Sequence, residues 1–229
     1  MNTPAAPAIP ETPTRAMLAT LGLVAALCGL IIVSAYEGSL PAVKENRRIS
    51  IERAIHKVLP GAKKIVGYFA LPSGDVVPAK EGDTPTGALT FHAAWGDNDR
   101  LLGIAAEGSG KGYADAVRIL FGYEPGCQCI VGMSVVFMRE TPGIGDKIIT
   151  DPAFVANFKA LEAKLTPDLK ALANAIKTVK AGTKSKAWEI DAIAGATITS
   201  RAVGRAINDT AQVLLPRIAP NLDKIGKPQ

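Results

Sequence analysis

The sequence predicts an α+β protein in which one N-terminal transmembrane helix precedes an antiparallel sheet with flanking helices. Three observations lead to this prediction. An uncharged apolar run occupies residues 16–36. Short strand-like runs separated by turn residues fill positions 64–140, and helix-like apolar spacing follows in the last third of the chain. With 229 residues, 48% of them hydrophobic, the chain is long enough to enclose one real core.

The N-terminal segment is expected to anchor the chain in a membrane. Residues 1–15 are rich in Pro, Ala and Thr and predict a disordered tail. The run at 16–36 matches the roughly 20 apolar residues that a membrane crossing needs. A cleaved signal peptide is the competing interpretation, because Val33-Ser34-Ala35 resembles a cleavage site. The run exceeds the roughly 7–15 residues of a signal-peptide core, which favours an uncleaved transmembrane helix.

Charges near this span point the C-terminal domain towards the cytoplasm. Only Arg15 precedes the span, whereas four basic residues follow it closely, at Lys44, Arg47, Arg48 and Arg53. Because positively charged loops tend to stay inside, a simple count places the larger part of the chain in the cytoplasm.

A connecting helix and five strands are predicted next. Residues 37–61 form the connecting helix, which ends at Pro60-Gly61. Apolar runs bounded by turn residues then predict strands at Ile65–Leu71, Ala88–Trp95, Leu101–Ala106, Ala114–Tyr123 and Ile130–Arg139. The run from Gly108 to Gly112 lacks the spacing of a phosphate-binding loop and is interpreted as a flexible hairpin turn.

Helices and one further strand complete the predicted domain. Asp151-Pro152 opens a helix whose apolar face includes Phe154, Phe158 and Leu161. Thr166-Pro167 opens a second helix with apolar positions through Ile176. A strand at Trp188–Ile193 and a helix from about Ser200 to Leu215 follow. The domain is therefore expected to span 62–215, with a poorly ordered tail at 216–229.

The few cysteines and histidines exclude several chemistries. Cys28 lies within the predicted span. A disulfide between Cys127 and Cys129 would close a very small, strained ring, so the pair is interpreted as strand-start residues open to oxidation outside the cell. Two thiolates do not complete a zinc site, and no metal site is predicted. Two histidines, His56 and His92, offer no hydrolytic triad, so no catalytic residue is proposed.

The net charge of +5 does not indicate nucleic-acid binding. The basic residues are spread along the chain without a nucleic-acid motif. One local cluster comprises Lys177, Lys180, Lys184 and Lys186. It fits either the phosphate of a ligand or the acidic groups of a docking partner, although a solvated lysine-rich turn is the more common reason for such a cluster.

The stretch from Asp191 to Ser200 carries the main functional signal. Ala194-Gly195-Ala196 leaves little side-chain bulk, so that a ligand can approach the backbone. Thr197, Thr199 and Ser200 supply hydroxyls and candidate N-caps for the helix that follows. A phosphate at Thr197 would meet unpaired backbone N–H groups and the positive end of a helix dipole. The stretch therefore predicts a phosphate-bearing ligand.

A second motif runs from Glu140 to Lys147. Pro142 fixes one backbone angle, while Gly143 and Gly145 permit turns that other residues avoid. Such a segment can present backbone groups to a flat polar ring. By itself, the motif is equally compatible with a purely structural turn.

These two motifs resemble the FMN-binding domains of the RnfG and NqrC subunits of membrane redox complexes. Asp191–Ser200 resembles the family's flavinylation motif, and Glu140-Thr141-Pro142-Gly143-Ile144-Gly145 resembles its flavin-lining Glu-Thr-Pro-Gly-Leu-Gly stretch. The chain has Ala194 where the family usually has Ser or Thr.

The resemblance implies that FMN is attached covalently by a dedicated flavin transferase. Thr197 is the implied acceptor of the phosphoester bond. The other implied cofactor-binding residues are Glu140, Thr141, Gly143, Gly195, Ala196 and Thr199. Since aromatic residues make up 5% of the chain, mostly aliphatic walls are expected around the flavin ring.

An RnfG-like subunit is the preferred functional prediction. It would relay electrons in a complex that couples ferredoxin and NAD oxidoreduction to ion transport, together with membrane and iron–sulfur subunits. The family places the flavin domain on the periplasmic side of the bacterial inner membrane, in conflict with the charge count. An NqrC-like subunit of a sodium-pumping quinone reductase and a cofactor-free, anchored assembly module are the alternatives.

Overall fold

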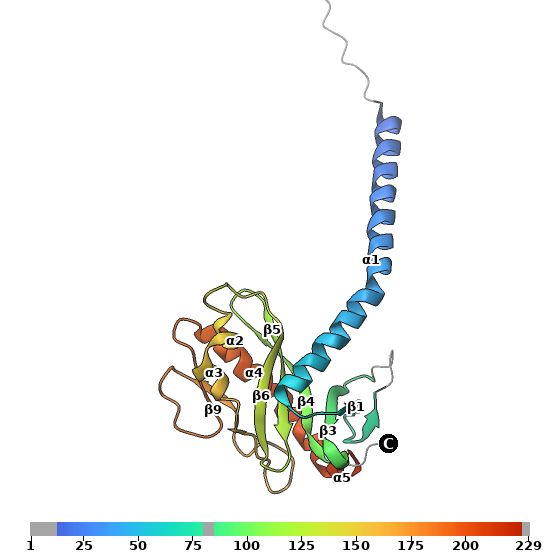
Figure 1. Cartoon of the computed structure of the whole chain (residues 1–229). Helices are drawn as coiled ribbons and strands as arrows, with labels where there is room; N and C mark the ends of the chain where they lie inside the picture. The colour runs from blue at the N-terminus through green and yellow to red at the C-terminus, as the bar shows by residue number, and fades with distance from the viewer. Residues whose placement is uncertain (1–12, 80–84, 226–229) are drawn as a thin grey trace, which may run out of the picture. The chain divides into compact units, whose positions relative to one another are not determined.

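The computed structural model describes residues 13–79 and 85–225, drawn in Figure 1. Most of the tail predicted at 1–15 therefore lies outside the described residues. Contacts divide the chain into two units, with Arg48 as the last residue of the first and Ile49 as the first residue of the second.

Helix α1 runs without a break from Thr14 to Val58 and includes both the predicted span and the predicted connecting helix. By its length and apolar composition, α1 is able to cross a membrane, and its large apolar residues between Met17 and Val33 are exposed. His56 is exposed near the end of the helix, as expected for a surface residue.

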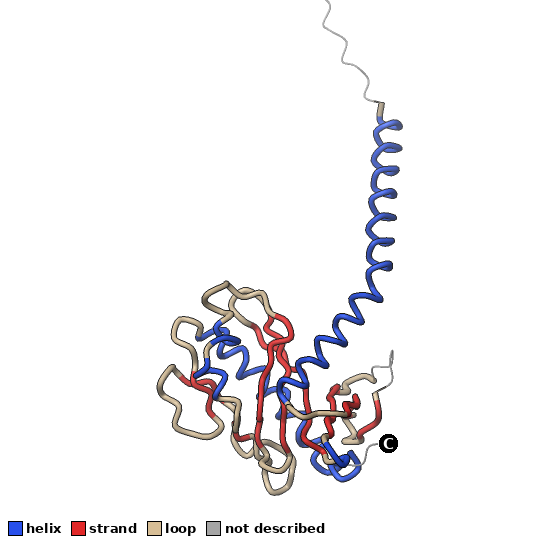
Figure 2. The backbone as a smooth tube through the Cα atoms, in the orientation of Figure 1, coloured by secondary structure: helices blue, strands red, loops and turns tan. Residues whose placement is uncertain are grey.

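A seven-stranded antiparallel sheet is the centre of the second unit, shown in red in Figure 2. Its strand order is β2-β1-β3-β4-β5-β6-β7. The strands are β1 Lys64–Ala70, β2 Val76–Pro78, β3 Leu89–Trp95, β4 Leu101–Lys111, β5 Ala116–Glu124, β6 Cys129–Phe137 and β7 Leu161–Glu162, with the 3₁₀ turn η1 Asp97–Asp99 between β3 and β4. All five predicted strands are confirmed. Four agree within two residues at each end, whereas β4 continues from the predicted end at Ala106 to Lys111.

Each face of the sheet has its own hydrophobic core. On one face, Phe91, Trp95 and Phe121 pack with residues of the C-terminal helix α4. On the other face, Leu120 packs with the last turns of α1, which contribute Ile55. Phe91 is buried and His92 only partly so, as expected for neighbours that point to opposite faces of a strand.

Helix α4, Thr197–Ile218, lies directly against β4. A Cβ at Gly108 would collide with the carbonyl of Ala206, and a Cβ at Gly110 with that of Ala202. Both glycines are in β4, so the flexible turn predicted from Gly108 to Gly112 is wrong. The glycines allow the close approach of helix and strand.

Two short helices follow β6. They are α2, Lys147–Thr150, and α3, Pro152–Ala156. The Asp151 carboxylate accepts hydrogen bonds from the N–H groups of Ala153 (2.9 Å) and Phe154 (3.1 Å), as the predicted helix start requires. Phe154 and Phe158 pack edge to face, with ring centroids 5.3 Å apart.

The helix predicted from Thr166 to Ile176 does not form. The Thr166 hydroxyl donates to the Asp168 carboxylate at 2.6 Å and accepts from the Ala171 N–H at 3.3 Å, and Leu169 has a φ of 57°. These local bonds compete with helical hydrogen bonds. The strand predicted at Trp188–Ile193 is confirmed as β9, Glu189–Asp191. It forms a separate parallel pair with β8, Lys177–Val179, and neither β8 nor this pairing was predicted.

The C-terminal segment is more ordered than predicted. Helix α4 begins three residues before Ser200 and continues to Ile218, followed by η2 Ala219–Asn221 and α5 Leu222–Ile225. Ile218 and Ile225 are buried in the main core. The predicted tail at 216–229 is therefore helical as far as residue 225, and its last four residues lie outside the described part.

Cys127 and Cys129 form a disulfide at the β5–β6 turn, with Cα atoms 5.2 Å apart. The expectation that ring strain disfavours this bridge is therefore wrong, whereas Cys129 begins β6, as a strand-start residue should. Gln128 between them has a φ of 50°, and this left-handed conformation turns the chain sharply enough to bring the two cysteines together.

Gly110→Ala is expected to lower the free energy of unfolding by about 1–3 kcal/mol, because the new methyl group pushes α4 away from β4. Denaturant unfolding of the detergent-solubilised chain measures this change. Gly126→Ala is the control, since its Cβ would lie at an ordinary 3.7 Å from the Glu124 carboxylate. Equal stability of the two variants would contradict the proposed close packing.

Candidate functional site

A cavity of about 550 Å³ lies between the start of α4 and the turn that follows Glu140. Its lining brings together the two motifs singled out in the sequence. The lining residues are Tyr113, Glu140, Thr141, Ile144, Gly145, Gly195, Ala196, Thr197, Ile198 and Thr199. The volume is within the 300–1,000 Å³ usual for cofactor sites.

The N-terminus of α4 opens into this cavity without a side-chain cap. Ala196 occupies the N-cap position, and within the described chain no side chain accepts from the first turn. The prediction that Thr197, Thr199 or Ser200 caps the helix is wrong, because all three lie inside it. The N–H groups of the first turn have no acceptor within the helix, so they remain available to a ligand.

Ser200 instead fixes the turn that precedes the helix. Its hydroxyl accepts from the Ile193 N–H at 3.1 Å and donates to the Ala196 carbonyl at 2.9 Å. Gly195 within this turn has a φ of 82°, a conformation that side chains disfavour. Thr197 is thereby held, partly exposed, at the first position of a rigid helix.

Glu140 connects its own turn to α4 and to the β4–β5 turn by hydrogen bonds. One oxygen of its carboxylate accepts from the Thr199 hydroxyl at 2.6 Å. The carboxylate also accepts from backbone N–H groups of the β4–β5 turn, at 3.3 Å from Tyr113, 3.1 Å from Ala114 and 3.5 Å from Asp115. The predicted polar contact to a ligand is thus also the group that positions the walls of the cavity.

The pKa of Glu140 lies below its ordinary value of 4.5. Partial desolvation alone raises this pKa, but the hydrogen bonds from Thr199 and from the three backbone N–H groups together outweigh it. Glu140 is therefore ionised at neutral pH and contributes a fixed negative charge beside the cavity.

Glycines on both sides make room for this carboxylate. A Cβ at Gly112 would collide with a carboxylate oxygen of Glu140, and a Cβ at Gly145 with the Glu140 side-chain carbon. Gly143 has a φ of 77° in the intervening turn, where the Thr141 carbonyl accepts from Ile144 and Gly145. Gly143 itself does not line the cavity.

The rim of the cavity is apolar and exposed. Tyr113 is 72% exposed, Ile144 51% and Ile198 48%. Side chains of this kind rarely stay so exposed together without a partner or ligand to cover them. Tyr113 and Ile198 were not predicted as site residues. Tyr113 lies outside both motifs, and Ile198 lies within Asp191–Ser200 but was not among the residues named there as cofactor contacts.

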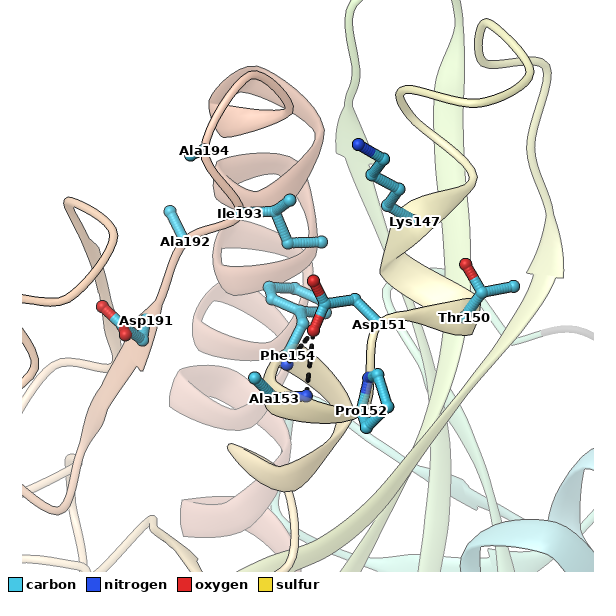
Figure 3. A pocket seen from close by; sticks show the side chains of 10 residues that line it. All are labelled: Lys147, Thr150, Asp151, Pro152, Ala153, Phe154, Asp191, Ala192, Ile193 and Ala194. Atoms are coloured by element: carbon cyan, nitrogen blue, oxygen red, sulfur yellow. Dashed lines mark hydrogen bonds between the residues drawn. The ribbon is translucent and has the colours of Figure 1, made fainter.

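A second cavity of about 450 Å³ lies beside the segment that leads into the motif, shown in Figure 3. Residues 191–194 form one wall, and α2 and α3 form the other, with Lys147 at the rim. Its Asp151 carboxylate is already occupied by the helix-capping bonds drawn in Figure 3.

Asp191 and Asn157 hold the strand that enters the motif. The Asp191 carboxylate accepts from the N–H groups of Gly182 (3.0 Å) and Thr183 (3.3 Å). The buried Asn157 amide pairs with the backbone N–H and carbonyl of Asp191, at 3.0 and 3.2 Å. No local sequence pattern predicts this role of Asn157, because its partner lies 34 residues away.

The decisive comparison concerns residues 112–212, which match the model of the FMN-binding domain. This segment is therefore similar to FMN-binding domains. The match includes every residue that lines the first cavity, from Tyr113 to Thr199.

Two relatives whose complexes are known are also similar to this chain over most of its length. The chain is 29% identical over 163 residues to the G subunit of the Na(+)-translocating ferredoxin:NAD(+) oxidoreductase complex of Acetobacterium woodii, covering 70% of this chain and 72% of that protein. It is 26% identical to the proton-translocating counterpart of Clostridium ljungdahlii, covering 81% and 83%. The chain is thus similar to subunits of oxidoreductase complexes, as the resemblance in its motifs implied.

Solved structures confirm the fold. NqrC of Shewanella oneidensis superposes with a TM-score of 0.61 at 21% identity, covering 79% of this chain and 98% of that one. The C subunit of the Na(+)-translocating NADH-quinone reductase from Parabacteroides distasonis gives a TM-score of 0.58 at 18% identity, covering 83% and 98%. An α+β fold with an antiparallel sheet and flanking helices is therefore shared with these proteins.

Thr199→Val is expected to lower the free energy of unfolding by about 1.5–3 kcal/mol at neutral pH, the usual contribution of a hydrogen bond to a charged group. A lowered pKa means that Glu140 stabilises the folded chain above pH 4.5, and that this contribution is lost as the pH falls through the lower pKa of the folded state. The difference between wild type and variant should shrink over that acid range.

Denaturant unfolding at a series of pH values measures this difference. Thr210→Val is the control, because the Thr210 hydroxyl donates to the uncharged carbonyl of Glu107 at 3.5 Å. Its effect should not vary over the acid range. A pH-independent effect of Thr199→Val would show that the bond to Glu140 does not stabilise the site.

Proposed function

We propose that Thr197 carries FMN through a phosphoester bond and that the chain relays electrons through this flavin. The observation that carries the proposal is the uncapped N-terminus of α4, which opens into the cavity with Thr197 at its first position. In the attachment step, a bond forms between the Thr197 oxygen and the flavin phosphorus. The bond from phosphorus to the donor's leaving group breaks, and the hydroxyl proton passes to that group.

The residues around Thr197 fit a phosphate. Backbone N–H groups of the first turn of α4 supply donors, and the helix dipole favours negative charge at this end. Gly195 has no atom within 4 Å of a hypothetical Cβ, so its backbone is open to the cavity. Ala196 and Gly195 therefore leave space for a phosphate and the chain that links it to the ring.

The remaining cavity fits a flat, largely apolar ring. Ile144 and Ile198 provide aliphatic walls, and Tyr113 adds one aromatic side chain beyond the expected aliphatic set. Thr141 and Glu140 supply polar contacts at the edge. Bound FMN supplies the ability to accept electrons singly or in pairs, while these residues orient the ring and limit its exposure to water.

The chain is best placed as an RnfG-like subunit of a complex that couples ferredoxin and NAD oxidoreduction to ion transport. The similarity to the G subunits of two such complexes supports this assignment. Helix α1 would anchor the chain in the bacterial inner membrane, with the flavin domain on the periplasmic side. Membrane and iron–sulfur subunits would be its partners, and a flavin transferase would attach the cofactor.

An NqrC-like subunit of a sodium-pumping quinone reductase is the second candidate, favoured by the fold shared with NqrC. Co-purified subunits distinguish the two. A ferredoxin-oxidising iron–sulfur subunit supports the RnfG-like assignment, whereas a quinone-reducing set supports the NqrC-like one.

Thr197→Ala is expected to abolish covalent flavin. The wild-type chain, produced together with its flavin transferase, should show in-gel flavin fluorescence after denaturation and a mass increase of one FMN less one water. Thr210→Ala, which removes a hydroxyl farther along the same helix, should keep both signals. Absence of flavin from the wild-type chain would support the alternative of a cofactor-free assembly module.

Ala194→Ser is expected to raise the fraction of chains that carry flavin when the transferase is limiting. The exposed Ala194 occupies the position where related motifs have a hydroxyl that the transferase can recognise. The ratio of flavin absorbance to protein measures this fraction. An unchanged ratio would show that the missing hydroxyl does not limit attachment.

A further inference from the structure

A basic groove lies between β8 and the exposed side of α4. Its cavity of about 280 Å³ is lined by Ile176, Lys177, Thr178, Arg201, Gly204, Arg205 and Asn208. Three of these residues are cationic, and none of the described residues that line it is acidic. We call these residues the basic groove.

The basic groove begins close to the proposed flavin attachment. Arg201 and Arg205 follow Thr197 at intervals of four residues, so the three share one side of α4. With a rise of 1.5 Å per residue, the two arginines lie about 6 and 12 Å from Thr197 along the helix axis. Any protein seated in the groove would therefore lie beside the flavin.

The positive charges of the groove are largely uncompensated. Arg201 and Lys177 are exposed, and within the described residues neither side chain has an ion-pair partner. Arg205 donates to the Lys111 carbonyl at 2.8 Å, which orients the guanidinium without neutralising it. The groove thus presents fixed cationic groups to the solvent.

Two carboxylates close in sequence or register to the groove form no ion pair with its cations among the described residues. Glu189 is the register partner of Lys177 in the β8–β9 pair, but its carboxylate accepts from the N–H groups of Ser185 (2.8 Å) and Lys186 (3.0 Å). The Asp209 carboxylate accepts from the Asn208 side chain at 3.0 Å. Neither forms an ion pair with the groove among the described residues.

We propose that the basic groove docks an acidic surface of the protein that exchanges electrons with the flavin on Thr197. This inference rests on the proposed function. Guanidinium groups pair well with carboxylates, and complementary charge brings partners together in a defined orientation. Cations one helical turn apart, with Lys177 opposite, match several separate carboxylates of a protein surface better than one small anion.

The first test reverses two charges of the groove, Lys177→Glu and Arg201→Glu, in the membrane-embedded complex. Arg100→Glu with Lys159→Glu is the matched control, because both residues are exposed and outside the groove and the net charge changes equally. Covalent flavin is measured first by in-gel fluorescence. The initial rate of flavin reduction is then measured at low and high ionic strength.

The groove variant should keep its flavin, and at low ionic strength its flavin should be reduced about tenfold or more slowly than in wild type. Salt should slow flavin reduction in wild type but not in this variant. Wild-type rate and salt dependence in this variant would overturn the docking proposal and leave the proposed function intact. Loss of flavin from this variant alone would assign the groove to the transferase and also overturn it. Loss of flavin from the wild type would instead overturn the proposed function.

The second test joins amines to carboxylates in direct contact with a zero-length carbodiimide. Peptide mass spectrometry of the treated complex should find Lys177 linked to an Asp or Glu of another subunit, and Lys177→Gln should remove this link. Links from Lys159 serve as the background level. If Lys177 links to no other protein, or if inorganic phosphate alone protects it from acetylation, the groove binds no acidic partner.

Discussion

The geometry of the site depends on the hydrogen bonds that the Glu140 carboxylate accepts. It accepts from α4 through Thr199 and from the β4–β5 turn through three backbone N–H groups, while its own backbone begins the turn that lines the cavity. Hydrogen bonds to an ionised group are stronger than neutral ones. One side chain therefore determines the spacing between α4, the β4–β5 turn and the turn that follows Glu140. Only glycine fits at positions 112 and 145, because a Cβ there would collide with the Glu140 side chain.

The position of Thr197 is determined by the packing of α4 in the hydrophobic core rather than by contacts within the cavity. Gly108 and Gly110 let α4 lie against β4, and Ala202 and Ala206 on the helix are completely buried there. A helix held by such packing cannot slide or tilt freely, so its first residue has a defined position. A ligand bound at this residue pays little additional cost for ordering the protein.

Patterns that arise from neighbouring residues were predictable, and those that depend on distant partners were not. Strand alternation, the Asp151-Pro152 helix start and the Gly143 and Gly195 turns followed from local chemistry. The glycines of β4 were interpreted as a turn because the helix that requires them lies about 100 residues further on. Glu140 and Thr199 were both expected at the site, but their mutual bond spans 59 residues and only the fold reveals it.

The proposed roles of α4 explain why its exposed and buried sides differ so strongly. Its buried side fixes the helix in the core, its N-terminus faces the cavity, and its exposed arginines form one edge of the basic groove. If a partner docks in that groove, the helix proposed to bear the flavin is also the helix that positions the partner. The distance between donor and acceptor would then depend on one rigid element rather than on the relative placement of several loops.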